Sequence, residues 1–262
     1  MRPIETDCDT GLILLQTFFK EEKKMWGSWL QKEAAGLNIH LSSEQLARFA
    51  RYYEILAEKN KVMNLTAITE EKEVYIKHFY DSLTLARVVD LHTVKSLIDV
   101  GTGAGFPGIA VKIAFPHLHL VLLDSLKKRV TFLQEVVQEL GLKQVECIHG
   151  RAEDLGKQQK YRQAFDLATA RAVARLNVLA EYCLPFVRVG GSFVAMKGSD
   201  ISEETEEARP ALRILGKATL EITSFALPEN RGRRHLLLMK KRKPTPGAYP
   251  RKAGIPAKQP LS

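Results

Sequence analysis

The sequence contains no apolar run long enough to cross a membrane. None of the stretches in its 262 residues approaches the about 20 apolar residues that a bilayer span requires. The most apolar stretch near the N-terminus, residues 11–19, follows Glu5, Asp7 and Asp9, whereas a secretory signal begins with positive charge. We therefore expect no membrane association, and we interpret residues 11–19 as the core face of a short helix.

Cysteine is scarce. Cys8, Cys147 and Cys183 are odd in number, lie far apart and form no C-x-x-C pair. This pattern indicates neither a disulfide framework nor a zinc site, so we expect no metal. It favours a reducing compartment, the cytoplasm, in which each cysteine has a packing role.

Acidic residues are absent from the last 32 positions. The segment from Arg231 to Ser262 contains ten Lys or Arg and no Asp or Glu, so the preceding residues are close to neutral although the whole chain carries +9. Five of the eleven prolines also lie there, so we expect an extended rather than a helical tail. A solvated end is one interpretation; the other, which we favour, is an arm that binds nucleic-acid phosphates.

Helical patterns dominate the first 90 residues. One pattern, at 41–60, opens with Ser42 and Gln45 in capping-box spacing, and apolar residues then recur every three or four positions. A second pattern covers about 70–89.

From residue 95 onward, short apolar runs alternate with helical stretches, which predicts right-handed crossovers and a parallel sheet covered on both faces. Two later runs are joined by only seven residues, too few for a helical crossover, so they should pair antiparallel. We therefore predict an α/β fold, a doubly wound, mostly parallel seven-stranded sheet with a terminal antiparallel pair, preceded by an N-terminal helical region. The expected strands are 96–100, 119–123, 145–148, 166–170, 192–196, 219–227 and 235–241, with helices at about 107–115, 126–140 and 152–156.

A glycine-rich loop follows the first strand at once, and its lack of side chains suits a cofactor held by backbone groups. A dinucleotide fingerprint that began at Gly101 would need glycine at position 106, where the chain has Phe106. The shifted frame of Gly103, Gly105 and Gly108 does match. An NAD(P)-dependent oxidoreductase therefore stays open as an alternative.

The G-x-G-x-G pattern after an Ile-Asp-Val strand resembles the first motif of class I S-adenosylmethionine-dependent methyltransferases. Asp99, Gly101, Gly103 and Gly105 carry the resemblance, which implies that the loop backbone holds the methionine end of the cofactor. Asp124 ends the second strand, where a carboxylate can accept hydrogen bonds from ribose hydroxyls in either cofactor. Its alternative role is the N-cap of the next helix.

A longer set of motifs is similar to the 16S ribosomal RNA guanine-N7 methyltransferases, the glucose-inhibited division protein B family. The similarity covers roughly residues 40–262. It rests on MNLTAI, KHFYDSL, DVGTGAGFPGI, DSLKKR, GRAEDL, ARAVA, MKG, RRHLLLMKK and PTPGAYPRKAGIPAKQPL, in this order.

The resemblance implies S-adenosyl-L-methionine as cofactor and a further set of contacts to it. Many class I enzymes place Asp directly after the glycine that ends the third strand, but this chain has Arg151, so the adenine contact passes to Glu153. The implied cofactor contacts are Gly101, Phe106, Ala152, Glu153 and Arg171, and the implied RNA-facing residues are Lys127, Arg151, Lys197 and Arg234. For each basic residue the alternative is an ordinary surface charge.

Methyl transfer to guanine N7 needs no general base, because N7 carries a free lone pair. We therefore expect catalysis by proximity, with Arg171 and Arg151 as the candidates that hold guanine O6 or a phosphate and leave N7 free. An N/D-P-P-Y motif for amino-group methylation is missing after the fourth strand. His78 and Asp81 are expected to form a hydrogen-bonded lid or interdomain contact.

The expected partner is 16S ribosomal RNA or the small ribosomal subunit, bound by a monomer. A noncatalytic RNA-binding assembly protein is a third hypothesis, against which the intact glycine loop and Asp124 argue. The predicted parts are an N-terminal helical extension (1–40), a helical cap (41–90), a methyltransferase domain (91–241) and a basic, proline-rich tail (242–262).

Overall fold

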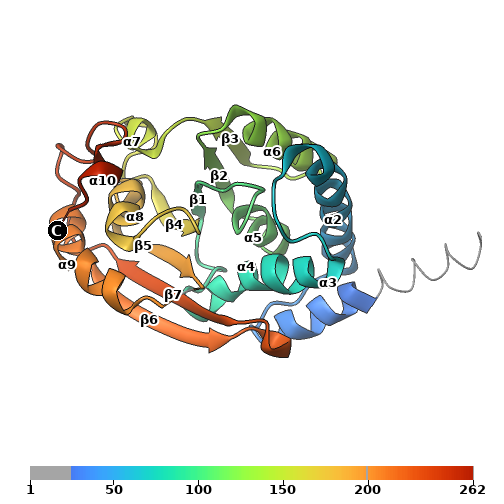
Figure 1. The fold of residues 1–262 in the computed structure, drawn as a ribbon. Helices are drawn as coiled ribbons and strands as arrows, with labels where there is room; N and C mark the ends of the chain where they lie inside the picture. Colours follow the sequence, from blue (N-terminus) through green and yellow to red (C-terminus); the bar gives the residue numbers. More distant parts are fainter. Residues whose placement is uncertain (1–24, 199, 262) are drawn as a thin grey trace, which may run out of the picture.

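Seven strands form one mixed sheet in the computed structural model, which describes residues 25–198 and 200–261 (Figure 1). Their order across the sheet is β3-β2-β1-β4-β5-β7-β6, and β7 runs in the direction opposite to the other six strands. The predicted sheet is therefore confirmed. The strands are β1 (Ser96–Val100), β2 (His119–Asp124), β3 (Val145–His149), β4 (Phe165–Arg171), β5 (Val187–Lys197), β6 (Thr219–Ala226) and β7 (Arg233–Lys240). The helix predicted at 11–19 and Cys8 lie outside the described residues.

Helices cover both faces of the sheet. Because successive strand side chains point to opposite faces, Leu97 joins the core beneath α5 and α6, whereas Ile98 joins the core beneath α8 and α9. The carboxyl ends of the parallel strands consequently meet at one open edge. The helices are α5 (Gly108–Ala114), α6 (Lys127–Glu139), α7 (Ala152–Leu155), α8 (Leu176–Cys183), α9 (Ser202–Gly216) and α10 (Ile255–Lys258).

The predicted helical region before the sheet is present and packs on the side of α5 and α6. Residues 25–35 are helical, and α2 (Ser43–Met63) begins with the predicted capping box. The second predicted helix is one continuous run with three geometries, since a π-helix replaces the α-helix in its middle. The run consists of α3 (Glu71–Val74), the π-helix η1 (Tyr75–Tyr80), α4 (Asp81–Leu83) and the 3-10 helix η2 (Thr84–Arg87).

Three helices of the described residues, α8, α9 and the short α10, were not predicted. In α8, Leu176, Leu179, Ala180 and Cys183 recur at helical spacing, so a signal was present but was overlooked in a run of only eight residues. In α9, Pro210 lies inside the helix, where proline removes a backbone donor.

The C-terminal segment is mostly non-helical, as predicted, but it packs against the protein and includes the short helix α10. Lys241 is fully buried, and its Nζ donates to the carbonyl oxygens of Leu184 (2.8 Å) and Val187 (2.7 Å). Arg251 forms an ion pair with Glu181. Composition counts charges but does not reveal such buried acceptors, and phosphate binding by the segment stays a prediction.

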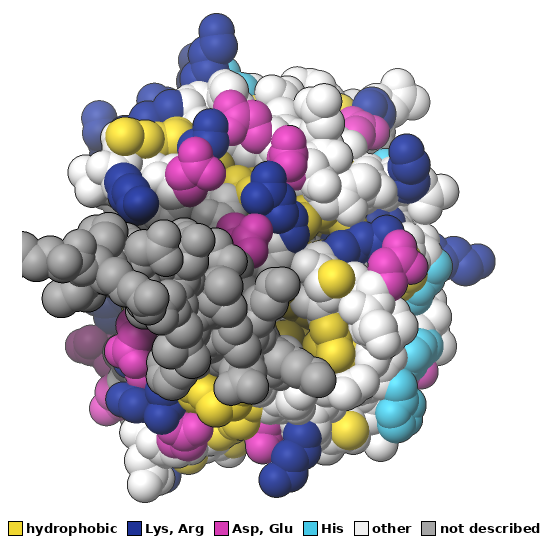
Figure 2. Space-filling model, turned by 90° about the vertical axis from the view of Figure 1, so that its right-hand side faces the viewer, with side chains coloured by type: hydrophobic (Ala, Val, Ile, Leu, Met, Phe, Trp, Pro, Cys, Tyr) yellow, Lys and Arg dark blue, Asp and Glu magenta, His cyan; other side chains and the backbone are white. Residues whose placement is uncertain are grey.

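Charges of both signs are interspersed on the face that includes α2 (Figure 2). Many are paired, such as Arg51 with Glu139 (2.8 Å) and Lys59 with Glu135 (2.6 Å), which join α2 to α6. The described residues of this face therefore do not form the single-sign field that attracts a polyanion. Among the described residues, no helix has both the length and the apolar character that a bilayer span requires.

Gln45 links α2 to the end of α5. Its Oε1 accepts from the backbone N–H of Ser42 (2.8 Å), and its Nε2 donates to the carbonyls of Ile113 (2.8 Å) and Ala114 (2.9 Å). Replacing Gln45 with Ala should lower the free energy of unfolding by about 1 to 3 kcal/mol, because cap and helix-end bonds are lost together. Urea unfolding would measure this loss. The exposed Gln138→Ala change in α6 is the matched control, and equal losses in both variants would contradict the prediction.

Candidate functional site

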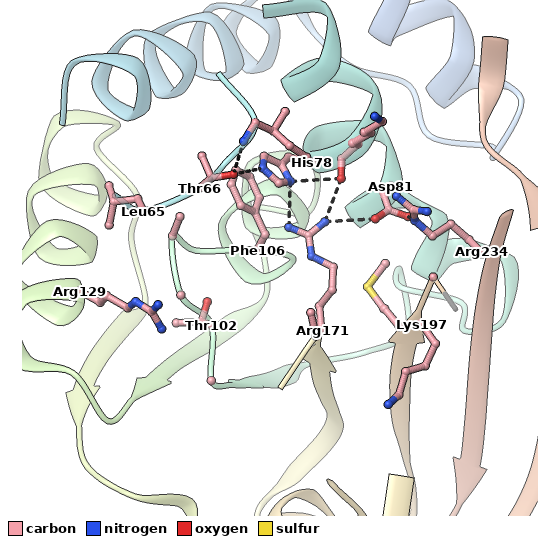
Figure 3. Close-up of a pocket in the computed structure, with 18 residues that line it drawn as sticks. Leu65, Thr66, His78, Asp81, Thr102, Phe106, Arg129, Arg171, Lys197 and Arg234 are labelled. Atoms are coloured by element: carbon pink, nitrogen blue, oxygen red, sulfur yellow. Dashed lines mark hydrogen bonds and ion pairs between the residues drawn. The ribbon is translucent and has the colours of Figure 1, made fainter. Parts of the chain in front are cut away.

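A cavity of about 530 Å³ opens at the carboxyl ends of β1 and β4 (Figure 3). Its volume lies within the range of about 300 to 1,000 Å³ that is typical of small-molecule sites. The edge is the one at which open α/β sheets bind ligands. The lining consists of Gly101–Ala104 and Phe106 after β1; Arg171 and Ala172 at β4; Met196–Gly198 at β5; Lys77, His78 and Asp81 in the helical run; Leu65, Thr66 and Ile68 after α2; Arg129 in α6; and Arg234 in β7.

The first glycines of the loop present backbone to this cavity. Gly101 and Gly103 have φ values of +70° and +62°, which side-chain-bearing residues rarely adopt. A Cβ on Gly101 would lie 2.7 Å from Val173 Cγ2, whereas a Cβ on Gly103 would meet no atom within 4 Å. Gly103 therefore faces open space, and the cavity wall is bare backbone at this point.

The next predicted cofactor contact, Gly105, faces the protein instead. Its φ is +99°, and a Cβ there would lie 2.6 Å from both Tyr52 Oη and Ile109 Cδ1. A dinucleotide fingerprint uses its second glycine to let a pyrophosphate approach the backbone. In the shifted frame that glycine is Gly105, whose open side is already filled. The oxidoreductase alternative is therefore not favoured.

Two buried carboxylates hold the loop in shape. Asp99 Oδ2 accepts from Thr102 Oγ1 (2.6 Å) and from Gly108 N (2.8 Å). Burial raises the pKa of Asp99 to about 6, and its Oδ1 has no hydrogen-bond partner among the described residues. Asp124 Oδ2 accepts from Gly103 N (2.9 Å), and its Oδ1 accepts from Leu126 N (2.9 Å).

Asp124 keeps the capacity to accept further hydrogen bonds. A carboxylate offers about four acceptor positions, and two backbone N–H groups occupy two of them. Its side chain is 2% exposed, with Arg129 Nη1 lying 3.5 Å from Oδ2. Arg129 reaches across from α6 toward the loop (Figure 3). We therefore expect a ligand that binds Asp124 to move the Arg129 guanidinium aside.

Arg171 joins the sheet to the helical run. Its Nη1 donates to Lys77 O (3.1 Å) and to Asp81 Oδ2 (3.2 Å), and its Nη2 donates to His78 Nδ1 (3.2 Å). The guanidinium carbon lies 5.1 Å from the centre of the Phe106 ring, on which the His78 ring also stacks at 4.5 Å. Figure 3 shows the three groups meeting above the end of β4. This cluster closes one wall of the cavity.

The cluster fixes the protonation of His78. Nδ1 lies 3.2 Å from both Arg171 Nη2 and the carbonyl oxygen of Lys77, and Nε2 lies 2.9 Å from Thr66 Oγ1, so both ring nitrogens have partners. Burial and the neighbouring Arg171 charge lower the His78 pKa to about 3. His78 is therefore neutral, and its basic nitrogen is already in use.

Comparison with known proteins identifies the family to which the chain belongs. A family model described as rRNA small subunit methyltransferase G, GidB, matches residues 45–237. The chain belongs to this family.

Individual relatives agree with the match. A protein named ribosomal RNA small subunit methyltransferase G from Brevibacillus brevis is 52% identical over 227 residues, which are 87% of this chain and 95% of the relative. Its namesake from an Exiguobacterium species is 54% identical, over 85% and 94%. An O-methyltransferase from Bacillus cereus, solved in complex with SAH, has a TM-score of 0.53 at 15% identity, covering 72% and 91%. That last likeness shows the fold alone.

The structure places the other residues singled out by the family resemblance in two groups. Lys197 and Arg234 line the cavity, but their cationic groups are engaged. Lys197 Nζ lies 2.7 Å from Ala174 O and 2.8 Å from Glu204, and Arg234 Nε lies 3.2 Å from Asp81. The second group lies outside the cavity lining and consists of Lys127 and Arg151, which are exposed, and Ala152 and Glu153, which are buried in α7.

Ten lining residues were not singled out from the sequence: Leu65, Thr66, Ile68, Lys77, Thr102, Ala104, Arg129, Ala172, Met196 and Gly198. All ten lie inside motifs of the family resemblance, so a signal was present, but the motifs did not show which side chains face the cavity. Met196, beside Lys197 in β5, is also buried in the core.

The neutral state of His78 has a consequence for stability. The unfolded imidazole takes up a proton near its ordinary pKa of 6.5, but the folded one does so only near 3. The unfolded state binds more protons between these values, so the free energy of unfolding falls as pH falls from about 6.5 to about 3. The His78→Gln variant should show a shallower decline in urea unfolding across this window. The exposed His40→Gln change is the control, and identical pH profiles in all three proteins would refute the assignment.

Proposed function

We propose that the protein transfers the methyl group of S-adenosyl-L-methionine to N7 of a guanine in 16S ribosomal RNA. The observation that carries this proposal is the bare backbone of Gly101 and Gly103 at the cavity wall, in a chain of the rRNA small subunit methyltransferase G family. The comparisons with relatives supply the class of substrate. The guanine and its N7 come from the resemblance described above.

The residues at the corner fit this donor. Gly103 leaves open space where a side chain would stand, and Asp124 has acceptor positions for ribose hydroxyls. The adenine of the donor would lie next to its ribose, and so near Asp124 at the end of β2. Glu153 is close to this point because β3 pairs with β2 and leads directly into α7. When bound, the donor supplies an electrophilic methyl group on a sulfonium. Gly101, Gly103, Phe106, Asp124, Ala152, Glu153 and Arg171 would hold it, and Gly105 would contribute by shaping the loop.

The protein's own part in catalysis is placement. Neutral His78 has no free basic nitrogen, and Asp81 is paired with two arginines, so neither is available to remove a proton. Attack by a guanine N7 lone pair requires no base, and positioning alone can supply a large part of the barrier reduction. Arg171, whose terminal nitrogens are engaged, acts by fixing the cavity wall rather than by pairing with the base.

The cations around the cavity would meet the RNA backbone. Lys127 and Arg151 are exposed at the starts of α6 and α7 and can meet phosphates directly. Lys197 and Arg234 would first have to exchange a carboxylate partner for a phosphate, since both are ion-paired. We infer that the partner is 16S ribosomal RNA or the small ribosomal subunit, and that a monomer acts on it in the cytoplasm without a metal ion.

Methyl transfer can be measured directly. Small ribosomal subunits would be incubated with the protein and methyl-labelled donor, and the labelled nucleotide would be mapped. We expect one labelled guanine, which becomes sensitive to strand cleavage at 7-methylguanine. Label on an exocyclic amine would overturn the N7 assignment. Absence of label, with RNA still bound, would favour a noncatalytic assembly protein.

Asp124 offers a quantitative test of the donor site. The Asp124→Asn variant should bind S-adenosylmethionine more weakly by about 1 to 3 kcal/mol in calorimetry, because charge-assisted hydrogen bonds to the ribose are lost. Asp90→Asn is a matched control, since Asp90 Oδ1 also accepts from the N–H two residues later (3.1 Å) but lies before β1, on the opposite edge. Similar affinities in the two variants would rule out the role given to Asp124.

A further inference from the structure

The C-terminal residues 244–258, called the strap below, are anchored on a buried carboxylate of α8. Arg251 donates to Glu181 from its backbone N (2.8 Å to Oε1), its Nε (2.9 Å to Oε1) and its Nη2 (2.6 Å to Oε2). The Glu181 side chain is 1% exposed. Bidentate arginine–carboxylate pairs are strongly directional, so this contact fixes the position of the strap as well as its attachment.

A second arginine ties the strap to the end of α7. The Arg162 guanidinium donates to the carbonyl oxygens of Thr245 (2.8 Å), Pro246 (3.0 Å) and Tyr249 (2.7 Å). It also donates to the carbonyl of Gly156 (3.1 Å), which directly follows α7. One side chain thus holds the strap and the short helix in a common arrangement.

The strap then reaches the carboxylate that the family resemblance places at the adenine. Gly254, at φ +83°, donates its N–H to Glu153 Oε1 (2.8 Å), and Glu153 is 5% exposed. Glu153 is in turn close in the fold to Asp124, because β3 pairs with β2 and Gly150 N donates to Asp124 O (3.1 Å). Figure 1 shows α10 beside α7 and α8 at this edge of the sheet.

We propose that the strap is part of the donor site and that Arg251 is its positioning residue. The inference rests on the proposed function. The Arg251 side chain binds Glu181, which does not line the cavity, and so holds the backbone that leads to Gly254. Gly254 in turn fixes one oxygen of Glu153 and leaves the other oriented for the adenine edge. Misplacing Glu153 weakens donor binding, whereas the methyl-transfer step at saturating donor is unchanged, because the cavity wall formed by Arg171 and Phe106 is intact.

Calorimetry with S-adenosylmethionine and with S-adenosylhomocysteine tests this role. The Arg251→Ala variant should bind both about tenfold more weakly, equivalent to about 1.4 kcal/mol. Arg251→Lys, which keeps one charged donor for Glu181, should recover part of the affinity. The control is Arg188→Ala, which removes a more exposed arginine–carboxylate ion pair, with Asp166 (2.6 Å), at the opposite edge of the sheet and should leave donor affinity within about twofold of the natural protein.

Two further readouts separate positioning from general destabilisation. Amide hydrogen exchange at residues 152–155 should accelerate in Arg251→Ala but not in Arg188→Ala, and kcat at saturating donor should stay within about twofold while KM for the donor rises. If Arg251→Ala does not fold, the comparison is made with Arg251→Lys and Arg251→Gln. If the natural protein binds no donor, both the proposed function and this inference are wrong. If the natural protein and the folded Arg251 variants bind the donor equally well, the role given to the strap is wrong and the proposed function stands.

Discussion

The structure depends on a corner that must carry no side chains and yet hold one shape. The loop after β1 achieves this with two buried carboxylates. Asp99 holds Thr102 and the start of α5, and Asp124 holds the N–H of Gly103. Because the anchors belong to the ends of β1 and β2, the sheet itself sets the loop geometry. The backbone of Gly101 and Gly103, open at Gly103, is thus a rigid surface, and its rigidity makes it suitable for a ligand whose own reactive atom must be placed accurately.

The opposite wall is built from a charged cluster instead of backbone. The desolvated Arg171 guanidinium is stabilised by Asp81, by a π-helix carbonyl and by the Phe106 ring. π-Helical turns often occur at functional sites, and here the turn carries both Lys77 and His78 to the arginine. The cluster clamps the helical region onto the sheet. It also removes His78 from acid–base chemistry, which agrees with a reaction that needs only placement.

The sequence predicted the sheet well because hydrophobic runs and short connections are local signals. All seven strands were found, whereas the eight-residue α8 was overlooked, α9 was hidden by Pro210, and α10 lies in a proline-rich tail. Within the site, local spacing identified the glycine loop and Asp124. It could not show that Gly105 faces Tyr52, that Arg129 lies beside Asp124, or that Lys241 and Arg251 have buried partners. These contacts join residues distant in the chain, so only the folded arrangement reveals them.

The most direct test of the central claim is a crystal structure of the protein with S-adenosylhomocysteine. The account predicts the amino-acid part of the molecule against the backbone of Gly101 and Gly103, the ribose on Asp124, and the Arg129 side chain displaced. The sulfur should face the cavity wall that Phe106 and Arg171 form. A nucleoside bound elsewhere, with the glycine corner unoccupied at saturating concentration, would contradict it.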